Sequence, residues 1–343
     1  MKHTNTGLLN LVILALALVL SVAVGAVSIP LPAQVQILLS RLLGMPVDPA
    51  LPATYETILL GIRLPHTILV ALCGAALAGS GAAYQGLFRN PLADPYLIGA
   101  ASGAGLGAVA AMAVLPMDSL ASKFTVPAAA FLGALALVGV VYWLAYTGSS
   151  SSPTTTLILA GVAAGSFASA LTSFLMLRSQ GELRRAVAWL MGGADASGWQ
   201  PVWAVLPYIV LGLGVLVTGG HALNVLQFGE EQASQLGLPV RRVKGWLVLA
   251  ATLTTAAAVS FLGIIGFVGL IVPHLVRLLW GPDHRRLLPL SILGGASALL
   301  LADVLARLLM APQELPVGII TALAGGPFFL WVLRYSQNLT ANE

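Results

Sequence analysis

The N-terminal stretch LLNLVILALALVLSVAVGAV, residues 8–27, contains no charged side chain. A run of about 20 apolar residues is long enough for a helix to cross the hydrocarbon core of a bilayer. The run is also longer than the apolar region of a typical secretory signal, so we predict a retained first span. Similar runs recur along the chain, which predicts an all-α polytopic membrane protein.

The composition agrees with this fold class. Of the 343 residues, 58% are hydrophobic and 8% are charged, whereas about 25% of residues are charged in an average soluble protein. The net charge of +4 does not indicate a nucleic-acid partner, because Lys and Arg fall in short loops next to lipid headgroups. The single cysteine, Cys73, excludes a disulfide framework and a cysteine-based metal site. We therefore expect a lipid bilayer and no nucleic acid as surroundings.

About ten apolar segments are predicted to span the bilayer. A count of nine stays open, because only the Gly-rich GIIGF region separates the seventh segment from the eighth. The loops between segments are short, so residues 1–343 are predicted to form a single transmembrane domain. The predicted spans are 7–28, 62–84, 96–115, 124–146, 155–177, 199–219, 245–262, 265–280, 287–306 and 316–335.

Small residues recur at helical spacing inside several spans. Gly99, Gly103 and Gly107 are four residues apart, and such stripes let membrane helices approach closely. The positive-inside rule favours a cytoplasmic N-terminus, with nine Lys and Arg residues on the inner side and seven on the outer side. The excess is small, so the outer arginines need a further explanation.

The motif search favours a transport protein over an enzyme. No Gly-Lys pair occurs, so the chain lacks a Walker A phosphate loop, and the zinc motif H-E-x-x-H is absent as well. Ser80 between two glycines is too weak a signal for a hydrolase. We therefore predict no catalytic residue and no metal site.

The alternative from another class is an ion-coupled secondary transporter for a small solute. Such proteins place ionisable residues near the bilayer midplane, where they bind coupling ions. The centres of the predicted spans contain almost no such residues. The energy for transport is therefore expected to come from another subunit.

The segment FGEEQASQLGLPVRRVKG, residues 228–245, concentrates charge in this apolar chain. Its two glutamates suit a helix N-terminus, and Gly237 suits the left-handed residue that ends a helix. Pro239 suits the first residue of a second short helix, which would carry the basic residues. We predict two short helices joined at the glycine on the cytoplasmic face, with a solvated loop as the alternative.

Five further stretches show a resemblance to a known family. The chain resembles the FecCD-type permeases, which are the membrane subunits of ABC importers for iron–siderophores, haem and vitamin B12. The resemblance runs from about residue 55 to 335 in the same order and spacing. The stretches are RNPLADP (89–95), GIIGFVGLIVPHLVR (263–277), GPDHRRLLP (281–289), ADVLAR (302–307) and ELPVGIITALAGGPFFLWVLR (314–334).

The resemblance implies a type II ABC importer permease that is dimeric around a central pathway. The partners would be a second permease copy or a related permease, two cytoplasmic ATPase subunits that bind ATP and magnesium, and an extracytoplasmic substrate-binding protein. The chain itself would hold no cofactor, and it would lie in the cytoplasmic (inner) membrane of a prokaryote. The segment 228–245 would dock on the ATPase through Glu230, Glu231, Gln235, Gly237, Arg241 and Arg242.

The same resemblance assigns a gate and a docking site. Thr154 and Thr155, at the start of the fifth span, match the family's cytoplasmic gate, although capping of the helix N-terminus is an alternative use of threonine. Arg63 and Arg307 match the outer positions that receive glutamates of the binding protein. His66 departs from the pattern, which has a second arginine there, so we expect docking to strengthen on mild acidification.

Overall fold

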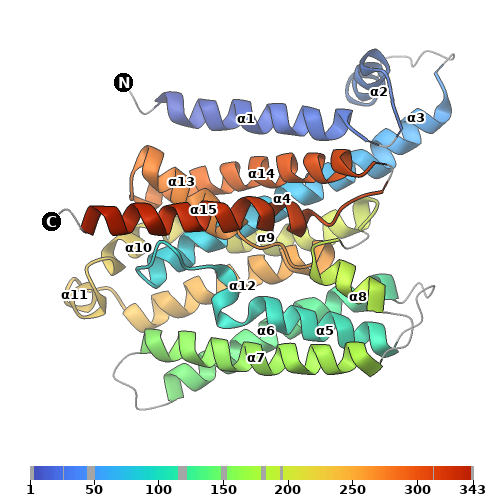
Figure 1. Cartoon of the computed structure of the whole chain (residues 1–343). Coiled ribbons are helices and arrows are strands. Elements are labelled where there is room, and N and C mark those ends of the chain that lie inside the picture. The colour runs from blue at the N-terminus through green and yellow to red at the C-terminus, as the bar shows by residue number, and fades with distance from the viewer. Residues whose placement is uncertain are drawn as a thin grey trace.

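The computed structural model of this chain describes residues 4–25, 27–44, 51–114, 122–147, 153–178, 183–193, 196–311 and 313–340. Within these residues the chain is helical and contains no strand (Figure 1). The helices are α1 (Thr4–Ala23), α2 (Leu31–Leu43), α3 (Ala53–Ile58), the π-helical turn η1 (Leu59–Arg63), α4 (Leu64–Leu87), the 3-10 turn η2 (Pro95–Ile98), α5 (Ala100–Val114), α6 (Ser122–Thr147), α7 (Pro153–Arg178), α8 (Leu183–Leu190), α9 (Trp199–Thr218), α10 (Gly220–Leu226), α11 (Glu230–Gln235), α12 (Val240–Leu262), α13 (Val268–Trp280), α14 (His284–Leu309) and α15 (Val317–Thr340).

The polytopic membrane fold predicted from the sequence is confirmed. In the described residues, six helices are long and apolar enough to cross a membrane, and four shorter apolar helices accompany them. These six and four helices overlap the ten predicted spans one for one. The second span is longer than predicted, because α3, η1 and α4 form one continuous helical stretch over residues 53–87.

The centre of the bundle is formed by α4, which packs against α14, α12, α13 and α9. Hydroxyl groups on α4 are satisfied across the helix interface: Ser80 Oγ donates to the Ala251 carbonyl at 3.1 Å, and Tyr84 and Thr252 hydroxyls lie 3.0 Å apart. Without a hydrophobic driving force inside lipid, such bonds and small residues hold helices together. Helices α6, α7 and α9 are more peripheral, since only about a third or less of each apolar window is buried.

Close packing at the glycine stripe of α5 agrees with the prediction. A Cβ at Gly103 would overlap the carbonyl oxygen of Gly133, and one at Gly107 would overlap that of Ala129. Both α5 glycines therefore face α6 at backbone contact distance.

The seventh and eighth predicted spans are two separate helices, because the segment 263–267 is not helical. It separates α12 from α13, and its backbone is bonded to neighbouring parts of the protein. Ile265 N–H donates to the Tyr96 hydroxyl at 3.2 Å, and the same hydroxyl donates to the Ile265 carbonyl at 2.9 Å. Non-helical backbone is tolerated at membrane depth where protein groups satisfy it in this way.

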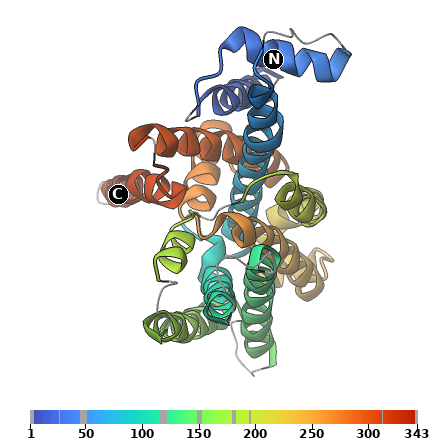
Figure 2. The same cartoon turned by 90° about the vertical axis from the view of Figure 1, so that its right-hand side faces the viewer.

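The two ends of the bundle differ in what they present. Helix α1 begins and α15 ends at the end that carries α11, whereas α2, α3 and α8 lie at the opposite end (Figure 1). We call these the α11 end and the α3 end. Across the bundle, α1 to α3 lie at one edge and α7 at the other (Figure 2).

The prediction of a second short helix in segment 228–245 was wrong. Residues 240–244 form the first turns of α12, which continues without a break to Leu262. The second short helix is instead α10, which precedes α11. Pro239 is the N-cap residue of α12, which begins at Val240 and continues through Gly245 without a break, so no second short helix ends there.

Candidate functional site

The short helix α11 is fixed at its C-terminal end by Gly237. This residue has φ 83°, as predicted, and its N–H donates to the Ser234 carbonyl at 2.9 Å while Leu238 N–H donates to the Ala233 carbonyl at 3.0 Å. The two bonds form a Schellman motif, in which glycine adopts the left-handed conformation without steric strain. The turn therefore sets the direction in which the chain leaves α11.

The outer face of α11 is open and partly apolar. Phe228 is 66% exposed and Leu236 is 69% exposed, although both belong to a segment predicted to lie outside the membrane. The predicted coupling residues Glu231 and Gln235 are exposed between them. Large apolar side chains next to polar ones are typical of a surface that binds another protein.

The predicted gate and the predicted coupling segment meet at Lys244, which the sequence analysis did not select. Lys244 Nζ lies 2.7 Å from Glu230 Oε1 and 2.8 Å from Thr154 Oγ1. The Thr154 hydroxyl donates to Glu230 Oε1 at 3.0 Å. Only 3% of Lys244 is exposed. Three helices, α7, α11 and α12, therefore share one polar contact.

The charge state of this contact follows from its surroundings. Burial alone would raise the pKa of Glu230, but the hydrogen bond and charge of Lys244, the Thr154 hydroxyl and the charge of Arg89 together lower that pKa below its ordinary value. Because the pKa of Glu230 is lowered in the folded state, the ion pair stabilises the fold at pH values above the ordinary glutamate pKa. This stabilisation is lost as the pH falls through the lowered pKa of Glu230. The contact is therefore expected to be unchanged between about pH 6 and 8.

The remaining predicted residues of this end lie near the same contact. Arg241 is stacked over the ring of Tyr146 on α6, with its guanidinium carbon 5.7 Å from the ring centroid. Arg242 and Thr155 are exposed. Thr154 lies inside the first turn of α7, which begins at Pro153, and its hydroxyl is engaged with Glu230 and Lys244. Its described bonds therefore link helices and do not cap the helix backbone.

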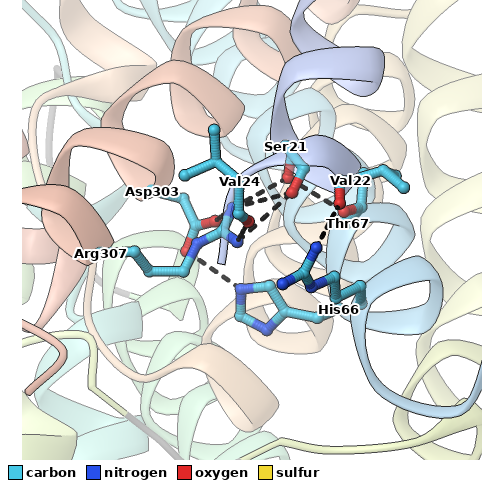
Figure 3. A network of polar contacts seen from close by, with 8 residues as sticks. Ser21, Val22, Val24, His66, Thr67, Asp303 and Arg307 are labelled. Carbon is cyan, nitrogen blue, oxygen red and sulfur yellow. Dashed lines mark hydrogen bonds and ion pairs between the residues drawn. The ribbon is translucent and has the colours of Figure 1, made fainter. Parts of the chain in front are cut away.

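At the α3 end, Arg307 forms an ion pair within the protein. Its Nη2 lies 2.8 Å from Asp303 Oδ2, one turn earlier on α14. Asp303 is only 6% exposed, and its Oδ1 lies 3.0 Å from His66 Nε2 (Figure 3). No role was predicted for Asp303, although Asp and Arg four residues apart on a helix are a usual ion-pair spacing.

Arg307 also binds the C-terminal end of α1. Its Nη1 donates to the Val24 carbonyl at 2.6 Å, and its Nη2 donates to Ser21 Oγ at 3.1 Å (Figure 3). The last carbonyls of a helix have no intrahelical partner and carry partial negative charge, so a guanidinium is a suitable cap.

Arg63 also contacts the C-terminal end of α1. It is 6% exposed, and its guanidinium donates to the carbonyls of Val22, Ala23 and Val27. The three predicted docking residues, Arg63, His66 and Arg307, therefore lie close together beneath the end of α1. Both guanidinium groups contact the end of α1, and His66 and Arg307 contact Asp303. Of these contacts, only the pairing of Asp303 with Arg307, one helical turn apart, has a local sequence signal.

Helix α7 carries polar residues on its exposed surface. Ser166, Ser169 and Ser173 recur every three to four residues and are exposed, so they follow one side of the helix. Ser166 and Ser173 donate to carbonyls one turn earlier, at 2.8 and 3.0 Å. Hydroxyl groups on the outside of an apolar helix favour contact with another protein or with water over contact with lipid tails alone.

The described residues contain no group of three or more His, Cys, Asp or Glu side chains that could hold a metal ion.

Comparison with known proteins identifies the family. Residues 13–335 match the FecCD transport family. A cobalamin import system permease protein of Halobacterium salinarum is 50% identical to this chain, over 84% of this chain and 76% of the relative. A hemin transport system permease protein of Yersinia pestis is 43% identical, over 80% and 82%. The solved structure of a metal-chelate type ABC transporter in an inward-facing conformation matches with a TM-score of 0.79 and 33% identity, over 95% of this chain and 97% of that one. The chain therefore belongs to the FecCD transport family.

Proposed function

We propose that this chain is the membrane-spanning permease subunit of an ATP-driven ABC importer in a prokaryotic cytoplasmic membrane. The relatives are named as permease proteins for cobalamin and hemin, and the matching structure is an ABC transporter. The structural observation that carries the proposal is the exposed face of α11. Phe228 and Leu236 flank this helix and expose large apolar side chains just before α12. An ion-coupled transporter has no evident need for such a surface.

The proposed assembly contains two copies of this permease and two ATPase subunits. The chain has no Walker A motif, so ATP and Mg²⁺ would bind the ATPase subunits, and this chain would hold no cofactor. Each α11 face would dock on one ATPase. The exposed serines of α7 favour this helix as the contact with the second permease copy. If two α7 helices pair across a two-fold axis, these hydroxyls are shielded from lipid and lie beside the shared pathway.

The proposed substrate class is a metal chelate that is too large and polar to cross lipid unaided. The names of the relatives favour a corrinoid or a haem over a ferric siderophore. The outer network is consistent with delivery by a binding protein at the α3 end, through Arg63, His66 and Arg307. Because both guanidinium groups cap α1 in this structure, glutamates of a binding protein would have to take the place of α1 carbonyls. The His66 ring is likewise engaged inside the protein, by Asp303. Stronger docking of the binding protein at mild acidity therefore stays a prediction.

Uptake into vesicles tests the proposed function. The permease, co-expressed with its candidate ATPase, is reconstituted with the binding protein outside and ATP inside. We expect uptake of radiolabelled cobalamin, hemin or ferric siderophore that requires ATP and vanishes when the ATPase carries a Walker A Lys→Ala substitution. Uptake that follows a proton or sodium gradient without ATP would instead establish the secondary-transporter alternative.

The turn at Gly237 gives a prediction about docking on the ATPase. No atom lies within 4 Å of the place that a Cβ would occupy, so Gly237→Val changes the backbone preference and not the packing. A β-branched residue is strained at positive φ by about 1–2 kcal/mol, which should turn α11 away from its partner. We expect at least about a fivefold loss of ATP-driven uptake, with normal insertion.

The matched control is Gly237→Asn, since asparagine tolerates the left-handed conformation. It should retain most of the uptake. Equal uptake by the valine and asparagine variants would show that the turn at Gly237 does not set ATPase docking.

A further inference from the structure

Lys244 joins the coupling segment to the gate at a buried position. Its Nζ contacts Glu230 on α11 and Thr154 on α7, at 2.7 and 2.8 Å. The side chain of Glu230 is 42% exposed, and the side chain of Lys244 is 4% exposed. The contact therefore begins at the surface of α11 and ends inside the bundle, at the first turn of α7.

A lysine is an unfavourable choice for a purely structural role at this position. Removing an ammonium group from water carries a desolvation penalty that the ion pair offsets only with good geometry and further hydrogen bonds. A methionine would fill similar space without that penalty. What the ammonium adds is a directional connection to two separate helices.

The attachment of α11 to the bundle makes this connection important. Within α11, only Ala233 is fully buried, and the other side chains are exposed or partly exposed. Glycines in positive-φ conformations flank the helix, Gly229 with φ 106° and Gly237 with φ 83°. A displacement of α11 is therefore passed to the bundle mainly through Glu230 and the packing of Ala233.

We propose that Lys244 is a positioning residue that couples α11 to the start of α7, so that movement of α11 shifts Thr154 and Thr155. This inference rests on the proposed function, in which an ATPase docks on α11, and on the cytoplasmic gate that the family resemblance implies at Thr154 and Thr155. Lys244 does not touch the substrate. Its role is to make α11 and α7 move together, with the Thr154 hydroxyl as the group on α7 that accepts its hydrogen bond.

The test compares Lys244→Met, Thr154→Val and Thr154→Ser in the reconstituted transporter. For each variant, uptake and ATP hydrolysis are measured in the same vesicles, and retention of the ATPase is measured during purification. Lys123→Met is the control, because it removes an exposed lysine at the opposite end of the bundle. Substrate imported per ATP hydrolysed is the quantity of interest.

We expect Lys244→Met and Thr154→Val to retain the ATPase and to hydrolyse ATP, because the outer face of α11 is unchanged. The ratio of uptake to hydrolysis should fall by about tenfold, within the usual range of coupling between two sites. Thr154→Ser keeps the hydroxyl and should recover the ratio relative to Thr154→Val.

A second measurement follows the gate directly. Thr155→Cys is introduced with Cys73→Ser, and disulfide formation between two permease copies is recorded with and without nucleotide. The yield should depend on nucleotide, and this dependence should disappear when Lys244→Met is added. A purely structural lysine would lower both yields together.

The outcomes separate this inference from the proposed function. If wild-type vesicles show no ATP-dependent uptake, the proposed function fails. If the wild type transports and both Lys244→Met and Thr154→Val keep the wild-type ratio, the coupling role of Lys244 is wrong. If Lys244→Met does not fold, Thr154→Val, which replaces one hydroxyl by a methyl group of similar size, decides between the two outcomes.

Discussion

Gly81→Val is expected to prevent this permease from folding. Gly81 is buried in the last third of α4, and a Cβ at this position would overlap the carbonyl oxygen of Gly269 on α13. The obstacle is backbone, which cannot rotate away as a side chain can. Helices α4 and α13 would have to move apart at the start of α13.

The expected destabilisation is about 3 kcal/mol or more, at the upper end of what overpacking produces. The measurement is the yield of monodisperse protein in detergent and its thermal midpoint. Gly214→Val on α9 is the control, because nothing lies within 4 Å of its Cβ position. It introduces the same β-branched residue into a membrane helix and should leave the yield close to that of the wild type. Similar yields for both variants would contradict the close approach of α4 and α13.

The number and order of the spans could be predicted because the physical signal is strong. A span is a long apolar run, and the runs here are bounded by charged or glycine-rich loops. The short helices were harder to foresee. Helix α2 lies in a segment treated as a loop, although Pro32 near its start and the left-handed Gly44 at its end were readable signals. Helix α8 is only eight residues long, too short for a clear period.

The partners of charged residues could not be predicted. Lys244 is ninety residues from Thr154 in the chain, and no local pattern connects them. From the sequence, Arg63 is expected to be exposed at the outer end of a span. In the structure it is buried, because the C-terminal end of α1 packs against it. Such contacts depend on how helices pack, and a single sequence does not encode that in its periodicity. The family resemblance provided the predicted site residues, and the structure showed which side chains and carbonyls they contact.

The ion pair of Asp303 and Arg307 gives the second large effect. Both side chains are about one-tenth exposed, and their charged atoms are 2.8 Å apart. Removing one partner of a buried pair leaves the other charge uncompensated, which costs about 3–5 kcal/mol. We therefore expect Asp303→Leu and Arg307→Met each to lower the thermal midpoint strongly.

The double variant should be less harmful than the two single effects added together. With both charges removed, no buried charge lacks a partner, and the coupling free energy measured by the cycle should be about 1–3 kcal/mol. Recovery will be incomplete, because Arg307 also caps the carbonyls of Ser21 and Val24 at the end of α1. Additive effects of the two substitutions would show that the pair is not formed in the membrane.

The same variants separate the structural role of Arg307 from its proposed docking role. Asp303→Leu leaves the arginine in place and removes its internal partner, so a docking arginine should still attract the binding protein, and association should remain salt-sensitive. Arg307→Met removes the charge itself and should slow association. Binding-protein association is therefore measured at several salt concentrations for both single variants that remain folded. If the two variants bind equally, Arg307 acts on the end of α1 alone, and docking must use other residues at the α3 end.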